Sequence, residues 1–421
     1  MSTASSIILK NNENVTFVSN PSITYFKSVY RKHTKFIIAY KEDNTTENNF
    51  KNSDNINIDL TNFGDLLCDI SLKVSINNQN DSLVPESYWK DNISLFLIDN
   101  IILKMVGPNI ELDKLDKDYI NFNAMLNNPK SLNSTYNIKN GSLTCDNGNN
   151  YQNMALCGGV INNNNISLPI KKMNAIIPLP FAFCKSIGNA IPLCALNTTN
   201  KHLQIILSTT NNTQAEFRFH EDLVKNKNII ELFEYSIISK YIFLSDEEKI
   251  RFLNSKQEYL YERVNVLNNG NSFTGREETI NISNLNPNNS IKSIYLYNQK
   301  NQPYNELKYK ININRQQIFS DNFNHEFFSK VEVLNRFKGC IYNMDQPGVS
   351  DKSNTIIDNN VAVIDFSLKN SDNPSGCISP NTNTIHLKII DNNNKGYNIK
   401  IYAVSYYLLS INNDRITYVF D

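Results

Sequence analysis

The stretch Phe17-Val-Ser-Asn20 decides the fold, because it returns later in the chain as Phe243-Leu-Ser-Asp246. A phenylalanine follows each copy at the same spacing, Phe26 in the first case and Phe252 in the second. After each copy comes a segment with the apolar spacing of a short helix, and then an extended run rich in aromatic residues. A local pattern that recurs so far along the chain indicates one structural unit present twice.

A second pair of matching segments lies further along and keeps the same order. Each segment carries a phenylalanine, a cysteine and a histidine that opens an apolar run, at nearly equal spacing. The matched residues are Phe183, Cys194 and His202-Leu-Gln-Ile-Ile206 in the first half, and Phe366, Cys377 and His386-Leu-Lys-Ile-Ile390 in the second. Two echoes in one order predict two homologous domains in tandem, of which the first has the longer loops.

The length of 421 residues exceeds one ordinary core and agrees with two domains. We expect an N-terminal arm at residues 1–16, a first domain at residues 17–228 and a second domain at residues 229–421. The join is expected in the polar stretch 209–228 or just after it. One alternative stays open, because the run 229–244 can also be the last strand of the first domain, leading directly into the second.

Strand signals dominate the chain. Runs with period-two alternation or continuous apolar character are bounded by Asn, Asp, Gly or Pro, without long helices between them. They cover residues 36–40, 56–60, 68–76, 94–98, 100–106, 203–207, 259–264, 290–297, 308–313, 361–366 and 399–409. This pattern predicts an all-β protein made of β-sandwiches with a few short helices.

Two short helices are predicted in equivalent places of the two halves. The first covers residues 21–30, where proline follows an asparagine cap and one face carries Ile23, Phe26, Val29 and Tyr30. The second covers residues 245–254, where Ser245 and Glu248 have the spacing of a capping box. The acidic first turn of this helix could also hold a cation, but interaction with the helix dipole accounts for its charges.

Charge and cysteine usage exclude several classes of protein. Lys plus Arg number 41 and Asp plus Glu also number 41, without a basic stripe, so no direct nucleic-acid contact is expected. No apolar stretch reaches the roughly 18 residues of a membrane span, so no transmembrane segment is expected. The 7 cysteines are scattered and include no Cys-x-x-Cys pair, which predicts reduced, unbridged thiols.

The sequence lacks the motifs that carry enzymatic chemistry, among them a Gly-rich phosphate loop, a His-Glu-x-x-His zinc motif and a Gly-x-Ser-x-Gly elbow. We therefore predict no enzyme, no catalytic or cofactor-binding residue and no bound metal. His202 and His386 are candidate ligands, but their repetition in both halves favours a shared structural role. The segment 391–396 faintly matches a calcium loop, yet Lys395 replaces an oxygen ligand, so a hairpin turn is predicted.

The segment 127–165 is a long insertion rich in Asn and Gly, which is typical of a surface excursion. Its apolar cluster consists of Met154, Ala155, Leu156, Cys157 and Val160. We expect this cluster to contact a neighbouring subunit, and the alternative is that it packs onto its own domain. Glycan acceptor triplets begin at Asn14, Asn44, Asn92, Asn133, Asn165, Asn197, Asn211 and Asn281, and most are attributed to the abundance of Asn.

One segment also supports a family resemblance. Asn20-Pro-Ser-Ile-Thr-Tyr-Phe-Lys-Ser-Val-Tyr-Arg-Lys-His-Thr-Lys-Phe36 resembles the N-terminal signature of the major capsid proteins of nucleocytoplasmic large DNA viruses. Further segments agree with that family in order: 179–184, 190–196, 241–252, 374–377 and 400–406. The resemblance therefore spans nearly the whole chain.

The resemblance implies two consecutive eight-stranded jelly rolls, a double jelly roll, in each chain. It also implies homotrimers that act as pseudo-hexagonal capsomers of an icosahedral shell, in contact with neighbouring capsomers and minor capsid proteins. Glycans on outer loops, a place in the virion and assembly in the host cytoplasm are further expectations of the family. No cofactor is implied.

Three alternative functions remain open at the level of sequence. The chain lacks the tryptophan that the family usually has in the segment corresponding to residues 180–183, and its last residues, 412–421, lack the family's Gly-rich ending. These differences leave a diverged minor capsid paralogue as one alternative. Jelly rolls also occur in lectins, so a carbohydrate-binding protein is a second. A tandem-cupin enzyme is a third, and the scattered histidines weigh against it.

Overall fold

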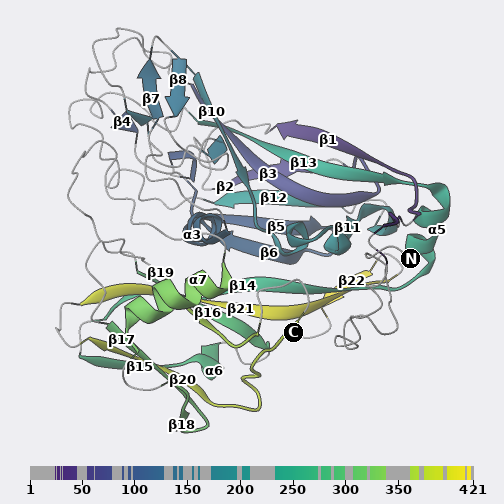
Figure 1. Cartoon of the computed structure of the whole chain (residues 1–421). Coiled ribbons are helices and arrows are strands. Elements are labelled where there is room, and N and C mark those ends of the chain that lie inside the picture. The colour runs from purple at the N-terminus through teal and green to yellow at the C-terminus, as the bar shows by residue number, and fades with distance from the viewer. Residues whose placement is uncertain are drawn as a thin grey trace, which may run out of the picture. The chain divides into compact units, whose positions relative to one another are not determined.

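A computed structural model describes most of the chain, and Figure 1 shows its elements. The described residues are 24, 26–28, 30, 32–44, 55–60, 62–77, 88–89, 93–95, 98–127, 136–139, 142–145, 154–155, 160–161, 172–196, 202–208, 233–273, 276–285, 289–298, 307–319, 323–337, 361–368, 374–391, 396–412 and 415–418. The chain divides into two units, residues 1–35 and residues 36–421. The strands described below all belong to the second unit.

The first β-sandwich consists of a five-stranded and a four-stranded antiparallel layer, here called sheets A and B (Figure 1). Sheet A has the order β1 (Phe36–Asn44), β13 (Phe233–Leu244), β3 (Leu66–Asn77) and β10 (Lys172–Pro178), with β11 (Ile191–Pro192) also paired to β3. Sheet B has the order β2 (Asn55–Asp59), β12 (His202–Ser208), β5 (Asn100–Val106) and β6 (Ile110–Asp116). Strands next to one another in these sheets are therefore often distant in sequence.

The second β-sandwich consists of sheets D and E. Sheet D has the order β14 (Gln257–Phe273), β21 (Tyr397–Asn412), β16 (Ile291–Asn298) and β19 (Val361–Asp365), with β22 (Arg415–Tyr418) also paired to β21. Sheet E has the order β15 (Glu277–Asn281), β20 (Ile385–Asp391), β17 (Leu307–Ile313) and β18 (Gln316–Gln317).

The two sandwiches repeat each other strand by strand. When the eight strands of each sandwich are numbered in chain order, both have one sheet in the order 1-8-3-6 and another in the order 2-7-4-5. This is the arrangement of an eight-stranded jelly roll, in which the first and last strands are neighbours. The predicted duplication and the double jelly-roll fold are therefore confirmed, and the matched histidines lie in strands β12 and β20, each the seventh of its set.

Alternation of apolar side chains explains how each sandwich encloses a core. In strand β5 every second residue is buried, and the inward side chains include Ile101 and Leu103. Strand β3 supplies Ile70, Leu72 and Val74 from the facing sheet. In such strands successive side chains point to opposite faces, so an apolar residue at every second position fills the space between the sheets.

One predicted strand, at residues 94–98, is wrong in its described part. Residues 94 and 95 belong to the 3-10 helix η2 (Ile93–Leu95), Ile98 belongs to no strand, and residues 96 and 97 lie outside the described residues. The backbone N–H of Ile98 donates to the carbonyl of Leu95 at 3.2 Å, which closes a turn. Both side chains are buried, and a short buried apolar run has the same pattern in a turn and in a strand.

The helix predictions had mixed outcomes. Helix α5 (Asp246–Asn254) confirms the second one, although its cap residue Ser245 makes no side-chain capping bond and accepts only through its carbonyl, from the N–H of Lys249 at 2.9 Å. The first is wrong in the described part, because residues 24, 26–28 and 30 are not helical and the side chain of Phe26 is fully exposed. Residues 21–23, 25 and 29 lie outside the described residues.

Further helices and a small sheet complete the described fold. Helix α3 (Lys117–Asn127) lies between the fifth and sixth strands of the first sandwich, and the π-helix η8 (Phe327–Val331) with helix α7 (Glu332–Arg336) lies at the matching place in the second. The other short helices are η3 (Ala182–Lys185), η4 (Ile187–Asn189), η5 (Leu193–Leu196) and α6 (Ile282–Leu285). Sheet C joins β4 (Tyr88–Trp89), β9 (Val160–Ile161), β7 (Tyr136–Lys139) and β8 (Ser142–Cys145).

The pairing of strand β13 indicates to which of the two domains residues 233–244 belong. The strand pairs with β1 from Phe36 opposite Leu244 to Asn44 opposite Ser236, and it also pairs with β3. Of the two assignments that the sequence left open for residues 229–244, the pairing agrees with a last strand of the first sandwich. The domain boundary at residue 228 remains a prediction.

Candidate interface between the two sandwiches

Buried aromatic side chains join the two sandwiches. From helix α3 of the first sandwich, Phe122 lies 5.3 Å from Tyr402 and 5.6 Å from Tyr295, measured between ring centroids. It also stacks on Tyr297 at 5.7 Å, and Tyr119 lies 6.2 Å from Tyr402. Aromatic pairs at 4.5–7 Å stabilise a contact beyond the area that they bury. One hydrophobic cluster therefore continues from the first core across α3 to the second sandwich.

Strand β16 shows why this contact forms. Its side chains Ile294 and Leu296 face the core of the second sandwich, whereas Tyr295 belongs to the cluster shared with the first. Because neighbouring side chains of a strand point to opposite faces, the strand is apolar on both sides of sheet D. A sheet with two apolar faces needs a cover on each, and helix α3 covers the outer one.

A lysine and two aspartates fix the start of helix α3 against sheet D. The Nζ atom of Lys400 lies 2.6 Å from Oδ2 of Asp118 and 3.2 Å from Oδ2 of Asp116. The hydroxyl of Tyr402 donates to the same oxygen of Asp116 at 2.5 Å. Burial raises the pKa of Asp116. Burial alone would lower the pKa of Lys400, but the two carboxylates raise it, so the lysine is held in its charged form.

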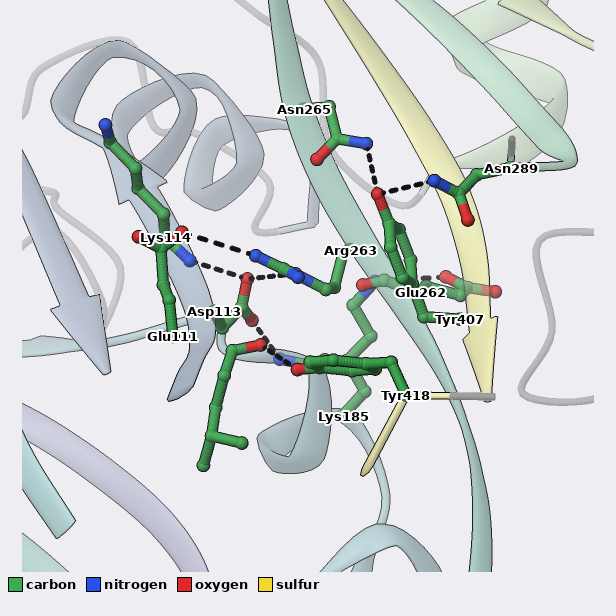
Figure 2. A network of polar contacts seen from close by, with 12 residues as sticks. Glu111, Asp113, Lys114, Lys185, Glu262, Arg263, Asn265, Asn289, Tyr407 and Tyr418 are labelled. Carbon is green, nitrogen blue, oxygen red and sulfur yellow. Dashed lines mark hydrogen bonds and ion pairs between the residues drawn. The ribbon is translucent and has the colours of Figure 1, made fainter. Parts of the chain in front are cut away.

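Arg263 of strand β14 forms a second contact, which Figure 2 shows. Its guanidinium lies 5.0 Å from the ring centroid of Tyr407 and 5.4 Å from that of Tyr418. Its nitrogens lie 3.4 Å from Oε1 of Glu111 and 3.8 Å from Oδ1 of Asp113, both on β6 of the first sandwich. Cation–π and ionic contacts thus hold one arginine between the two sandwiches.

Asp113 lies at the centre of this contact and is buried. Its Oδ2 atom accepts a hydrogen bond from the N–H of Ala182 at 2.9 Å, which connects β6 to helix η3. Burial raises the pKa of Asp113, although the charge of Arg263 opposes that shift. The carboxylate therefore connects β6, helix η3 and strand β14.

Glu262 bridges lysines from both sandwiches. Its Oε1 lies 2.6 Å from Nζ of Lys292 on β16, and its Oε2 lies 3.0 Å from Nζ of Lys185 on η3. Burial raises the pKa of Glu262, but the two lysines outweigh burial and lower it overall. Beside it, the hydroxyl of Tyr261 donates to the carbonyl of Asn189 at 3.0 Å. A half-buried charge with two opposite partners specifies one relative geometry of the elements that carry it.

The two candidate histidines have ordinary structural surroundings. Nε2 of His202 lies 3.2 Å from Oδ1 of Asp59 on the neighbouring strand, and the side-chain amide of Gln204 donates to the same oxygen at 2.7 Å. His386 is half-buried in β20 and stands opposite Asn281 of β15. In the described residues, no group of three or more His, Cys, Asp or Glu side chains is arranged to hold a metal ion.

The predicted hairpin turn at residues 391–396 is wrong. Strand β20 ends at Asp391 in sheet E, and β21 begins at Tyr397 in sheet D, and the two strands do not pair with each other. Residues 392–395 lie outside the described residues, but the strands on either side of them belong to different layers of the sandwich. Local composition predicts a turn equally well in both cases, because it carries no information about the strand that follows.

Cysteine placement agrees with the prediction as far as the structure describes it. Cys68, Cys184, Cys194 and Cys377 are free thiols. Burial raises the pKa of Cys68 to about 11, whereas Cys377 is exposed. The side chains of the other cysteines, Cys145, Cys157 and Cys340, lie outside the described residues.

The insertion at residues 127–165 packs differently from the expectation. It supplies β7, β8 and β9 of sheet C. Ala155 is buried in the core of the first sandwich, and its carbonyl accepts from the hydroxyl of Ser94 at 3.2 Å. The predicted role of Ala155 as an anchor on a neighbouring subunit is therefore wrong. Met154 is half-buried, and the side chains of the other three members lie outside the described residues.

Two of the glycan acceptor triplets begin in described residues, and the rest lie outside them. Asn44 ends strand β1 and is exposed, whereas Asn281 ends strand β15 and is half-buried. In the described part of the chain, no helix is long and apolar enough to cross a membrane.

Two consecutive jelly rolls in one chain, with the same strand order, define a class by fold, the double jelly-roll proteins. The profile described as "Major capsid protein N-terminus" matches residues 24–245. The chain therefore belongs to the major capsid protein family, whose members are structural proteins of the virion and not enzymes.

Similar proteins agree with this assignment. The chain is 24% identical over 418 residues to the major capsid protein of Pyramimonas orientalis virus, covering 95% of this chain and 94% of that protein. It is 26% identical over 296 residues to capsid protein 1 of Acanthamoeba polyphaga mimivirus, covering 67% of this chain and 46% of that protein. The structure of VP54 of PBCV-1 matches with a TM-score of 0.67 at 18% identity, covering 94% of this chain and 100% of that one, which shows the fold alone.

Proposed function

We propose that three copies of this chain assemble into a pseudo-hexagonal capsomer, the tile of an icosahedral viral shell. The duplicated sandwich carries this proposal, because each copy presents two similar jelly rolls with matching strand order. Three copies around a threefold axis would present six similar units, which suits a lattice position with six neighbours. The contacts of Phe122 and Glu262 support the proposal, since they fix the angle between the two jelly rolls of one chain.

The domain limits follow from the same argument. We place the first jelly roll from β1 to β13 and the second from β14 onward, with helix α5 as the connection between them. In this proposal the second jelly-roll domain starts in the segment after Leu244 and not at residue 229. The duplication supports this division, because β13 and β21 are the eighth strands of their sandwiches.

The partners of the capsomer are neighbouring capsomers and minor capsid proteins, with glycans on outer loops and assembly in the host cytoplasm. Equal numbers of acidic and basic residues, 41 of each, support a shell protein without direct contact to the genome. No cofactor or metal belongs to the proposed function.

The mass of the purified protein in solution tests the proposal. Light scattering coupled to size-exclusion chromatography should give three times the chain mass of 48.3 kDa. Electron microscopy of the same sample should show particles with six similar lobes. A monomer at micromolar concentration, or a dimer, would contradict the trimer, and it would leave the family assignment in place.

A further inference from the structure

Strand β22 is the shortest of the described strands of sheet D. In the part of the chain that the structure describes it pairs only with β21, from Arg415 opposite Asn412 to Tyr418 opposite Leu409. Strand β16 pairs with an earlier part of β21, residues 399–405, and does not reach this end. A short strand with a single neighbour opens at a lower free energy than the strands in the middle of its sheet.

This short strand nevertheless contacts the first sandwich. The hydroxyl of Tyr418 donates to the carbonyl of Leu112 on β6 at 2.5 Å. Its ring meets the ring of Tyr407 edge to face, with 5.9 Å between the centroids. Tyr418 is half-buried in these contacts, whereas Thr417 beside it is exposed. One side chain of β22 therefore connects sheet D to the first sandwich.

Tyr418 also forms one side of the cover over Arg263, as Figure 2 shows. The guanidinium lies near the rings of both Tyr407 and Tyr418. Tyr407 is held in place, because its hydroxyl accepts from the side-chain amides of Asn265 at 2.7 Å and Asn289 at 3.0 Å. The first ring of the cover is thus anchored in the second sandwich, and the second ring belongs to the short strand.

The charge of Arg263 depends on this cover. Its side chain is 13% exposed, and its hydrogen bond to Oε1 of Glu111 is long, at 3.4 Å. Its Nε atom is buried and has no hydrogen-bond partner among the described residues. A buried charge is costly unless hydrogen bonds or other charge interactions compensate for the lost water, and here the two rings supply part of that compensation. Removing one ring would let water reach the guanidinium.

From these contacts we infer that β22 is a strap, which opens as a unit, uncovers Arg263 and releases one end of the contact between the two sandwiches. The other end is the aromatic contact of Phe122 with Tyr402, five positions before Tyr407 on β21. Five residues of a strand span about 16–17 Å, so an open strap leaves that contact in place. The second sandwich also keeps a core of its own. The strap therefore allows the angle between the sandwiches to change while both stay folded.

Chemical modification of arginine tests the strap in the full-length protein, whatever its number of copies. Phenylglyoxal reacts with accessible guanidinium groups, and mass spectrometry gives the rate at each arginine. Tyr418→Ala should raise the rate at Arg263 about tenfold, the size of one lost cation–π contact. Arg336 is the internal reference, because its side chain is 19% exposed and is also held by carboxylates, and its rate should not change. Thr417→Ala on the exposed face of the same strand is the matched control and should change neither rate.

A third variant separates the ring from the hydroxyl. Tyr418→Phe keeps the ring over Arg263 but loses the hydrogen bond to Leu112, so the rate at Arg263 should rise less than in Tyr418→Ala. Equal rates at Arg263 in the wild type and in Tyr418→Ala would overturn the inference. A rise at both Arg263 and Arg336 would show a general loosening of the fold and would overturn it as well.

Hydrogen exchange of the wild type covers the case in which Tyr418→Ala does not fold. At low urea concentrations, the amides of residues 415–418 should exchange faster than those of residues 399–405 in β21. The modification rate at Arg263 should increase with urea in the same proportion as the exchange of β22, while helix α3 stays protected. Equal exchange of β22 and α3 would show that the contact between the sandwiches opens as a whole, without a strap.

Discussion

The rings of Phe122 and Tyr402 meet edge to face at 5.3 Å, although the two residues belong to different sandwiches. Their contact extends the core of the first jelly roll onto the outer face of sheet D, while the second jelly roll keeps a core of its own. Phe122→Ala should therefore lower the free energy of unfolding by about 3–5 kcal/mol, because it leaves a cavity in the shared cluster. Urea denaturation, monitored by far-ultraviolet circular dichroism, measures this loss.

The exposed residue Leu368 supplies the control for that experiment. Leu368→Ala removes an apolar side chain from the surface and should change stability by less than about 0.5 kcal/mol. Equal effects of the two substitutions would show that Phe122 does not support the second sandwich.

Glu262→Gln should be strongly destabilising, by about 3–5 kcal/mol, because it leaves the buried ammonium of Lys292 without its charged partner at 2.6 Å. Adding Lys292→Met to the variant removes the unpaired charge and should restore part of the stability. A double-mutant cycle from denaturant midpoints measures the coupling. Additive losses would mean that the two side chains do not interact in solution.

The same glutamate gives a prediction for pH dependence. Lys185 and Lys292 lower the pKa of Glu262 in the folded chain, so its contribution is present above the unfolded value of about 4.3 and is lost as the pH falls through the folded value. Asp113 behaves in the opposite way. Burial raises its pKa, so its share of the free energy of unfolding falls as the pH rises from about 3.9 to the folded value.

Asp113→Asn tests the second of these effects. The variant cannot ionise at this position, so its melting temperature should depend less on pH in the range just above pH 4 than that of the wild type. Differential scanning calorimetry between pH 4 and pH 7 provides the comparison. Asp59→Asn on the exposed side of β2 is the matched control, and a pH profile unchanged by Asp113→Asn would argue against a raised pKa.

Local sequence patterns predicted individual strands, but contacts between residues far apart in the sequence could not be predicted. The strand run at residues 290–297 was recognisable, because its second half, Ile294-Tyr-Leu-Tyr297, is continuously apolar, which marks a strand buried on both faces. What covers its second face was not recognisable, because Asp116 and Lys400 meet across 284 positions of sequence. Helix α3 was missed for a related reason. Its mixture of Asn and aromatic residues has weak helix propensity, and burial against two sandwiches decides its conformation.

The interface could have been suspected from one local signal. Glu262 and Arg263 are charged residues inside a strand otherwise rich in apolar side chains, and buried charges need partners. Sequence alone does not identify those partners, since Lys185 and Glu111 lie far away along the chain. The duplication itself was predictable, because two pairs of matching segments recur in the same order along the chain.

Thiol accessibility gives a chemical test of the structure. Cys377 should react first with an alkylating reagent in the native protein, because it is exposed. Cys68 should react slowly at neutral pH, because burial raises its pKa to about 11 and leaves little thiolate. After denaturation without reductant, mass spectrometry should find all 7 cysteines modified. A smaller number would reveal a disulfide.

Ala155 distinguishes packing within the chain from packing between chains. Its side chain is 1% exposed and belongs to the hydrophobic core of the first sandwich, so Ala155→Asp places a carboxylate among apolar side chains. The cost of an unpaired buried charge is at least several kcal/mol, so the variant should melt at a lower temperature even when it is diluted to a monomer. If the residue instead anchored a neighbouring subunit, the variant would keep the stability of the monomer and lose only the trimer. Thermal unfolding measured over a hundredfold range of protein concentration separates these outcomes, because only an effect on assembly changes with concentration.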